Sequence, residues 1–228
     1  RDRALAITGE LGHLHSRRLA LVFANVLAIE MRDAERMRVY AAEKLSPESD
    51  AYPQHVWTGL EVFNGYLDAL DGQPRRGVAR ILRVIDDPTL SEQAPGQQAT
   101  LLRVLLEACA LAGDARTGLA AAGRMLEQSN GVRLWEAEAH RFQAGFMAAL
   151  GRPDGDVEAE LNAALRIARE QGARLFELRA LRDLLRHRLR RDATNAEPVR
   201  EELAALLNSL PDGLDAPDFR DAAALITT

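Results

Sequence analysis

Two segments of this chain nearly repeat one another. Residues 131–139 read Gly-Val-Arg-Leu-Trp-Glu-Ala-Glu-Ala, and residues 172–180 read Gly-Ala-Arg-Leu-Phe-Glu-Leu-Arg-Ala, an offset of 41 residues. A weaker third copy relates residues 4–21 to residues 164–181. Self-similarity at a period of roughly 20–50 residues indicates a repeat array, in which each unit buries its apolar face against its neighbours. Such an array of helical pairs is normally a binding surface and not an enzyme, so the repeat constrains the fold more tightly than the function.

The spacing of apolar residues predicts helices along the whole chain and no strand. Gly and Pro mark the helix ends, and turns at Gly72, Gly113 and Gly151 are separated by 41 and 38 residues. We also expect Gly12 and Gly172 to close helices. The expected helices are 2–11, 16–31, 33–45, 54–70, 74–85, 96–112, 115–128, 134–150, 155–171, 175–191, 199–210 and 217–226.

The alternation of helix, short turn and helix can be aligned with the tetratricopeptide (TPR) pattern, in which small residues allow the two helices of a pair to cross closely. Gly65, Gly77 and Gly118 occupy such positions. We therefore expect an all-α, TPR-like solenoid of about five antiparallel helical pairs, forming a right-handed superhelix with a C-terminal capping helix. One domain would cover residues 1–228, with a severed half-repeat at 1–12, helical pairs over 13–192, and the last pair and cap at 193–228.

Several short segments resemble a known group of proteins. They are Trp-Glu-Ala-Glu-Ala-His-Arg at 135–141, Ala-Leu-Gly-Arg at 149–152, Ala-Ala-Leu-Arg-Ile-Ala-Arg at 163–169 and Gln-Gly-Ala at 171–173. This pattern resembles the C-terminal TPR-like region of large bacterial STAND-class signalling ATPases, of the LuxR type or linked to an adenylate or guanylate cyclase. Residues 213–222 resemble the end of that region. The resemblance implies a sensor and interaction arm that controls an attached ATPase and its effector.

Composition excludes several classes of partner. The chain has 34 acidic and 29 basic residues, a net charge of −5, which argues against an electrostatic nucleic-acid surface. The single cysteine, Cys109, excludes an internal disulfide and fits a reducing cytoplasm. The longest apolar stretch, Leu19–Ile29, contains Asn25 and is shorter than the roughly 20 residues that a membrane span needs. We expect a cytoplasmic protein with no membrane partner.

The chain begins at Arg1 inside an expected helix, so we also expect an excised piece of a longer protein.

Motifs for catalysis or cofactor binding are missing from the sequence. There is no phosphate-binding loop, no Gly-x-Ser-x-Gly nucleophile turn and no His-Glu-x-x-His helix. The spacing of Asp212, Asp215 and Asp218 is not that of a calcium loop, and helix capping is the better interpretation. Cys109, between two alanines, is interpreted as a small buried residue. We expect no catalytic residue, no cofactor and no metal, and hence no enzymatic activity for this chain.

The only concentration of basic residues lies on the helix expected over 174–191. Six arginines and His187 occur between residues 179 and 191, and Glu177 and Asp183 offer partial pairing. Arginines near a helix C-terminus also match the helix dipole. A solvated face, or contact with missing N-terminal domains, is preferred to nucleic-acid contact because no aromatic residues are interleaved.

A candidate binding groove follows from the helical register. In arrays of this kind the first helix of each pair lines the concave side, which places there Val62, Tyr66, Arg103, Glu107, Phe142 and Phe146. Arg103 and Glu107 are four residues apart and share a helix face. They are candidates to anchor a peptide carboxylate or small ligand beside aromatic contacts. The alternative is an ordinary surface ion pair, with core packing for the two phenylalanines.

These observations favour a non-enzymatic sensor or interaction domain of a bacterial signalling ATPase or transcriptional regulator. Its partner would be a protein, a peptide or a small-molecule effector, and it would also contact the missing ATPase and effector domains. The second hypothesis is a stand-alone TPR scaffold that tethers partner proteins.

Overall fold

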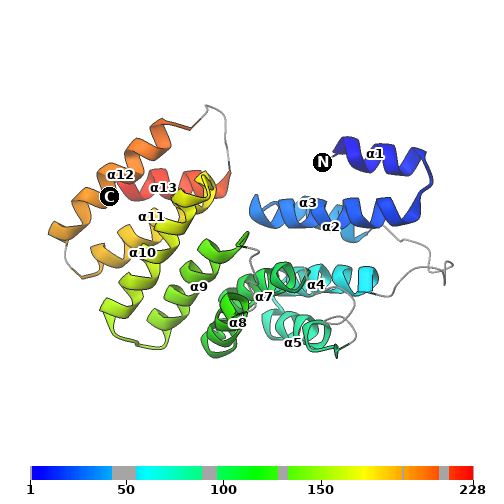
Figure 1. Ribbon diagram of the computed structural model, residues 1–228, viewed down its shortest axis with the longest axis horizontal. Helices are drawn as coiled ribbons and strands as arrows, with labels where there is room; N and C mark the ends of the chain where they lie inside the picture. The colour runs from blue at the N-terminus through cyan, green and yellow to red at the C-terminus, as the bar shows by residue number, and fades with distance from the viewer. Residues whose placement is uncertain are drawn as a thin grey trace. The chain divides into compact units, whose positions relative to one another are not determined.

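The computed structural model describes residues 2–42, 55–88, 97–127, 133–191, 193–210 and 216–227, and all regular structure in these ranges is helical (Figure 1). The prediction of an all-α fold is confirmed. By contact density the chain divides into an N-terminal unit, Arg1–Asp114, and a C-terminal unit, Ala115–Thr228. The expectation that residues 1–228 form one continuous solenoid of about five pairs stays a prediction.

The N-terminal unit is a succession of helices in which each packs against the next. It contains α1 (Asp2–Glu10), α2 (Leu14–Glu30), α3 (Ala34–Ala41), α4 (His55–Leu70), α5 (Pro74–Ile85) and α7 (Gln98–Ala112). In addition, α4 packs against α2, and α7 packs against both α4 and α5. Helices that are next but one in the chain therefore also meet, as in stacked helical pairs.

The C-terminal unit repeats this arrangement. It contains α8 (Ala115–Glu127), α9 (Glu136–Ala149), α10 (Asp154–Glu170), α11 (Arg174–Leu189), a short 3-10 turn η2 (Ala193–Ala196), α12 (Glu197–Asn208) and α13 (Pro217–Ile226). Figure 1 shows α9, α10 and α11 side by side, and α11 also contacts α9, α12 and α13. A core that includes Leu161, Leu181 and Leu203 joins α10, α11 and α12.

The glycine turns lie where the sequence predicts them. Gly72, Gly113, Gly151 and Gly172 follow α4, α7, α9 and α10, with φ of 84°, 64°, 67° and 64°. Glycine adopts this left-handed conformation readily because it has no Cβ, so these residues stop one helix and reverse the chain into the next. At the turn between α2 and α3 the same conformation falls on Arg32, with φ of 52°, and no glycine marks that turn in the sequence.

Close helix crossings depend on two further glycines. A Cβ added to Gly77 in α5 would lie 2.3 Å from the carbonyl oxygen of Gly65 in α4. A Cβ added to Gly118 in α8 would lie 2.3 Å from the Phe146 ring in α9. The interpretation of Gly65 and Gly77 as a small-residue crossing is confirmed.

The helix predicted over 33–45 ends four residues earlier, because α3 is Ala34–Ala41. The other predicted helix ends agree with the structure within two residues, and capping explains one difference. The His13 ring nitrogen accepts a hydrogen bond from the Ser16 backbone N–H at 3.3 Å, so α2 begins at Leu14, two residues before the predicted start. None of the described helices combines the length and apolarity that crossing a membrane requires.

Candidate functional site

Three of the six residues predicted to line a groove are packed inside their units. The exposed fractions of Val62, Phe142 and Phe146 are 0%, 6% and 5%. The Phe146 ring fills the space over Gly118, and its centroid lies 6.0 Å from that of Phe142. We therefore correct the placement of these three side chains from an open groove to the packed interior. Apolar periodicity identifies the buried face of a helix, and it cannot separate a binding groove from ordinary core packing.

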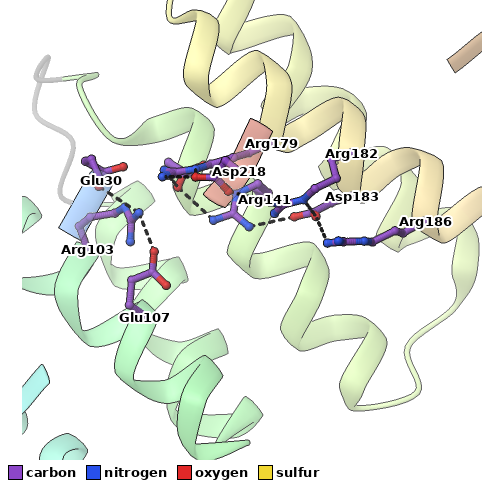
Figure 2. Close-up of polar contacts among 10 residues, drawn as sticks. Glu30, Arg103, Glu107, Arg141, Arg179, Arg182, Asp183, Arg186 and Asp218 are labelled. Atoms are coloured by element: carbon purple, nitrogen blue, oxygen red, sulfur yellow. Dashed lines mark hydrogen bonds and ion pairs between the residues drawn. The ribbon is translucent and has the colours of Figure 1, made fainter. Parts of the chain in front are cut away.

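The other three residues lie together in the N-terminal unit. Arg103 Nη2 is 2.9 Å from Glu107 Oε1, so the predicted pair at a spacing of four residues forms. The same nitrogen is 3.0 Å from Oε1 of Glu30 in α2, a partner that the sequence does not reveal (Figure 2). Arg103 is 1% exposed, so this is a buried triad and not a surface ion pair. The triad fixes the Glu107 carboxylate in place, because breaking a buried pair is costly.

A cavity of about 300 Å³, here called the N-terminal cavity, opens beside this triad within the N-terminal unit. Its lining combines apolar and polar side chains from α2, α3, α4, α7 and the α2–α3 turn, including Ile29, Arg32, Met37, Tyr66, Glu107 and Leu111. Two predicted site residues, Tyr66 and Glu107, therefore face the same cavity. The sequence indicated Tyr66 and Glu107 but not Arg32 or Met37. No pattern in the sequence shows that the α2–α3 turn and α3 lie beside α7.

Tyr66 is a neutral hydroxyl in this cavity. Burial and the neighbouring Glu107 carboxylate raise its pKa far above the ordinary value, and this outweighs the opposing effect of Arg103 and Arg32. Among the described residues no hydrogen-bond partner of Tyr66 is present. The cavity thus offers apolar walls with one hydroxyl, one fixed carboxylate and the Arg32 side chain. The hydroxyl and the carboxylate suit an apolar group that carries a hydrogen-bond donor.

The C-terminal unit contains a second buried polar cluster. Arg179 Nη1 lies 3.0 Å from Glu138 Oε2 of α9, and Arg179 Nε donates to Asp218 Oδ2 of α13 at 2.9 Å. Arg182 Nη1 donates to the other oxygen of Asp218 at 2.7 Å. Both arginines are nearly inaccessible, at 1% and 2% exposure. The expectation of a solvated basic face is therefore wrong for Arg179 and Arg182, whose partners come from distant helices.

Next to this cluster, Asp183 is shared by several guanidinium groups. Its carboxylate accepts hydrogen bonds from Arg141 Nη1 at 2.9 Å and Arg182 Nε at 2.9 Å (Figure 2). Arg141 is also bound through two hydrogen bonds, of 2.7 and 3.0 Å, to Glu138. Burial would raise the pKa of Asp183, but Arg141 and Arg182 outweigh that effect and hold it below its usual value. Asp183 therefore stays charged.

The repeat in the sequence contains a signal for these contacts. Trp135 and Phe176 are equivalent positions of the two copies, 41 residues apart, and their ring centroids lie 5.9 Å apart. Glu138 and Arg179 are also equivalent, carry opposite charges and form an ion pair. In a stacked array, equivalent residues of neighbouring repeats face each other. Opposite charges at equivalent positions would have predicted this buried pair.

The remaining reactive residues have structural surroundings. Cys109 is 0% exposed, and burial together with Asp114 raises the pKa of its thiol to about 12. Asp218 forms buried ion pairs and does not cap α13, while Asp212 and Asp215 lie outside the described residues. In the described part of the chain no group of three or more His, Cys, Asp or Glu side chains is placed to hold a metal ion.

No protein-family profile, curated protein or solved structure matches this chain. Its function is therefore argued from the two units themselves.

Proposed function

We propose that this chain is a non-catalytic sensor and protein-interaction domain, of the TPR-like kind, in a bacterial signalling ATPase or transcriptional regulator. It binds a partner protein, a peptide or a small ligand and thereby controls the attached effector. The observation that carries the proposal is the N-terminal cavity, which Tyr66 and Glu107 line together with Arg32 and apolar side chains.

Contacts between repeat copies support the helical-array part of the proposal. Trp135 with Phe176 and Glu138 with Arg179 join equivalent positions of α9 and α11. Equivalent helices that lie side by side are the expected result of stacking helical pairs, and stacked pairs offer partners a continuous face.

The chemistry of the N-terminal cavity supports the binding part. Glu107 is held by the buried Arg103, so its carboxylate needs little reorganisation to accept a donor from a ligand. Tyr66 adds a neutral hydroxyl, and Leu111, 48% exposed, provides an apolar rim. A volume of about 300 Å³ is small for a ligand site, so the cavity suits one side chain of a partner or a compact amphipathic molecule.

A thermal-shift screen with compact apolar amines and with peptides tests this function. A bound ligand raises the unfolding temperature by mass action, with about 2.7 kcal/mol gained at a hundredfold excess over Kd. Compounds that stabilise the wild-type chain should fail to stabilise Leu111→Asp, which places a charge at the apolar rim. Leu134→Asp is the matched control, because Leu134 is also exposed (57%) and belongs to the C-terminal unit. Ligands that stabilise both variants equally would contradict the proposal that they bind in the N-terminal cavity.

The attached effector needs a separate experiment. An antibody raised against this chain should detect, in the source cells, a native gene product well above the 25.1 kDa of this chain. A native product near that mass would contradict the attached effector and favour a stand-alone scaffold.

A further inference from the structure

A second cavity, of about 380 Å³, lies within the C-terminal unit between α9, α10 and α11. We call it the C-terminal cavity. The side of α9 that faces it is made of small residues, among them Gly145 and Ala148, and α10 adds Val157 and Leu161. The space exists because α9 lacks large side chains here: a Cβ added to Gly145 would meet no atom within 4 Å.

The opposite wall is basic. Asp183, Arg186, His187 and Arg190 of α11 line the cavity at spacings of three and four residues, so they share one helix face, and Arg141 joins them from α9. The lining thus contains three guanidinium groups and a single carboxylate. Since Asp183 stays ionised, the lining has an excess of two positive charges.

The guanidinium groups of this wall differ in the ion pairs that they form within the protein. Arg141 is occupied by Glu138 and Asp183. Arg186 reaches Asp183 only at 3.5 Å and is 39% exposed in its side chain (Figure 2). Arg190 is exposed, and in the described part of the chain it forms no ion pair. Most donors of Arg186 and Arg190 therefore remain available to an acceptor that enters the cavity.

His187 belongs to the same wall of the cavity. It is 8% exposed and lines the cavity, and its buried Nε2 atom has no hydrogen-bond partner among the described residues.

We propose that the C-terminal cavity binds a small organic dianion, with Arg186 and Arg190 pairing with its anionic groups. Guanidinium groups form paired hydrogen bonds with both carboxylate and phosphate oxygens, and two negative charges would neutralise the lining. Val157 and Leu161 contact the hydrocarbon part of the molecule. The site is separate from the N-terminal cavity, and the proposal does not depend on the function proposed above.

Isothermal titration of the full chain tests this site, with glutarate and glycerol 3-phosphate as probes at physiological ionic strength. Saturable binding of at least one probe is expected. Binding of glutarate alone identifies a dicarboxylate site, and binding of glycerol 3-phosphate alone identifies a phosphate site.

The double variant Arg186→Gln/Arg190→Gln should weaken binding of the probe at least about tenfold. The matched control Arg152→Gln/Arg166→Gln makes the same change of charge in the same unit, outside the cavity lining, and should bind like the wild type.

A second pair of variants separates occupancy of the cavity from charge. Gly145→Leu fills the space without changing any charged group and should abolish binding. Gly123→Leu in α8 is the control, since a Cβ there also meets no atom within 4 Å. Circular dichroism establishes that each variant is folded. The proposal is overturned if neither probe binds saturably, if both arginine pairs lose equal affinity, or if Gly145→Leu binds as tightly as the wild type.

Discussion

Replacing Arg179 with Met should destabilise the C-terminal unit by about 3 kcal/mol. Removing one partner of a buried ion pair costs about 3–5 kcal/mol, because the opposite charge stays buried without compensation. Arg179 is 1% exposed and pairs with both Glu138 and Asp218. We expect a value at the lower end of this range, because each carboxylate retains another ion-pair partner in the variant. Glu138 remains paired with Arg141, and Asp218 remains paired with Arg182.

Urea unfolding followed by tryptophan fluorescence measures this effect. The chain has two tryptophans, and in a Trp57→Phe background the remaining Trp135 reports on the C-terminal unit, where it is buried against Phe176. With a denaturant slope of about 2 kcal/mol/M, a loss of about 3 kcal/mol lowers the urea midpoint by about 1.5 M.

Arg166→Met is the matched control for this prediction. Arg166 also forms an ion pair, with Glu170, but its side chain is 61% exposed. An exposed pair contributes about 0–1 kcal/mol, so the control should change the midpoint little. If Arg179→Met shifted the midpoint no more than Arg166→Met does, the idea that Glu138 and Asp218 depend on Arg179 would be refuted.

Three further predictions concern packing and ionisation. Gly77→Ala should destabilise the N-terminal unit by about 1–3 kcal/mol in urea unfolding, because the added Cβ would lie 2.3 Å from the Gly65 carbonyl oxygen, whereas Gly123→Ala meets nothing and should cause no loss. Cys109, with its thiol pKa raised to about 12, should react with an aromatic disulfide reagent at about pH 8 only after unfolding, and rapid labelling of the native chain would contradict its burial. Asp183, with its folded pKa lowered, stabilises the fold above the unfolded carboxyl pKa of about 3.9 and loses that contribution as pH falls through the folded value. Asp183→Asn should therefore lose less stability than the wild type between about pH 6 and about pH 3, and an equal loss in both would exclude this role.

The helices and turns were predictable because their signals are local. Gly72, Gly113, Gly151 and Gly172 stop helices through their own backbone conformation, whatever surrounds them. The crossing of Gly65 and Gly77 was predictable for the same reason, since only missing side chains allow that approach. Arg32 adopts the left-handed conformation without being glycine, and no local signal reveals it.

The buried arginines were not predicted, because a helical pattern treats every arginine as a solvent-facing residue. Arg179 and Arg182 are buried by carboxylates from α9 and α13, and Asp218 lies 39 residues beyond Arg179. Only tertiary structure brings these groups together. The comparison of Glu138 with Arg179 across the repeat offset was the available clue, because it depends on stacking and not on composition.

The candidate site was predicted in part. Register placed Tyr66, Arg103 and Glu107 on the same side of the array. In the structure Tyr66 and Glu107 line one cavity, and Arg103 is paired with Glu107. The same register also included Val62 and Phe146, which are covered by neighbouring helices. Helical register predicts which residues lie on the same side of the array. Whether that side forms a cavity or is packed depends on the size of the side chains that face it.

Methyl NMR of the methionines tests the central claim, that the N-terminal cavity is a binding site, most directly. The chain has four methionines, so a spectrum of methyl-labelled protein is simple to assign. Met37 lines the N-terminal cavity, and Met125 is buried in the C-terminal unit. Titration with a ligand from the thermal-shift screen should shift the Met37 resonance and leave that of Met125 in place. A Met37 resonance that does not move while binding reaches saturation would contradict the account.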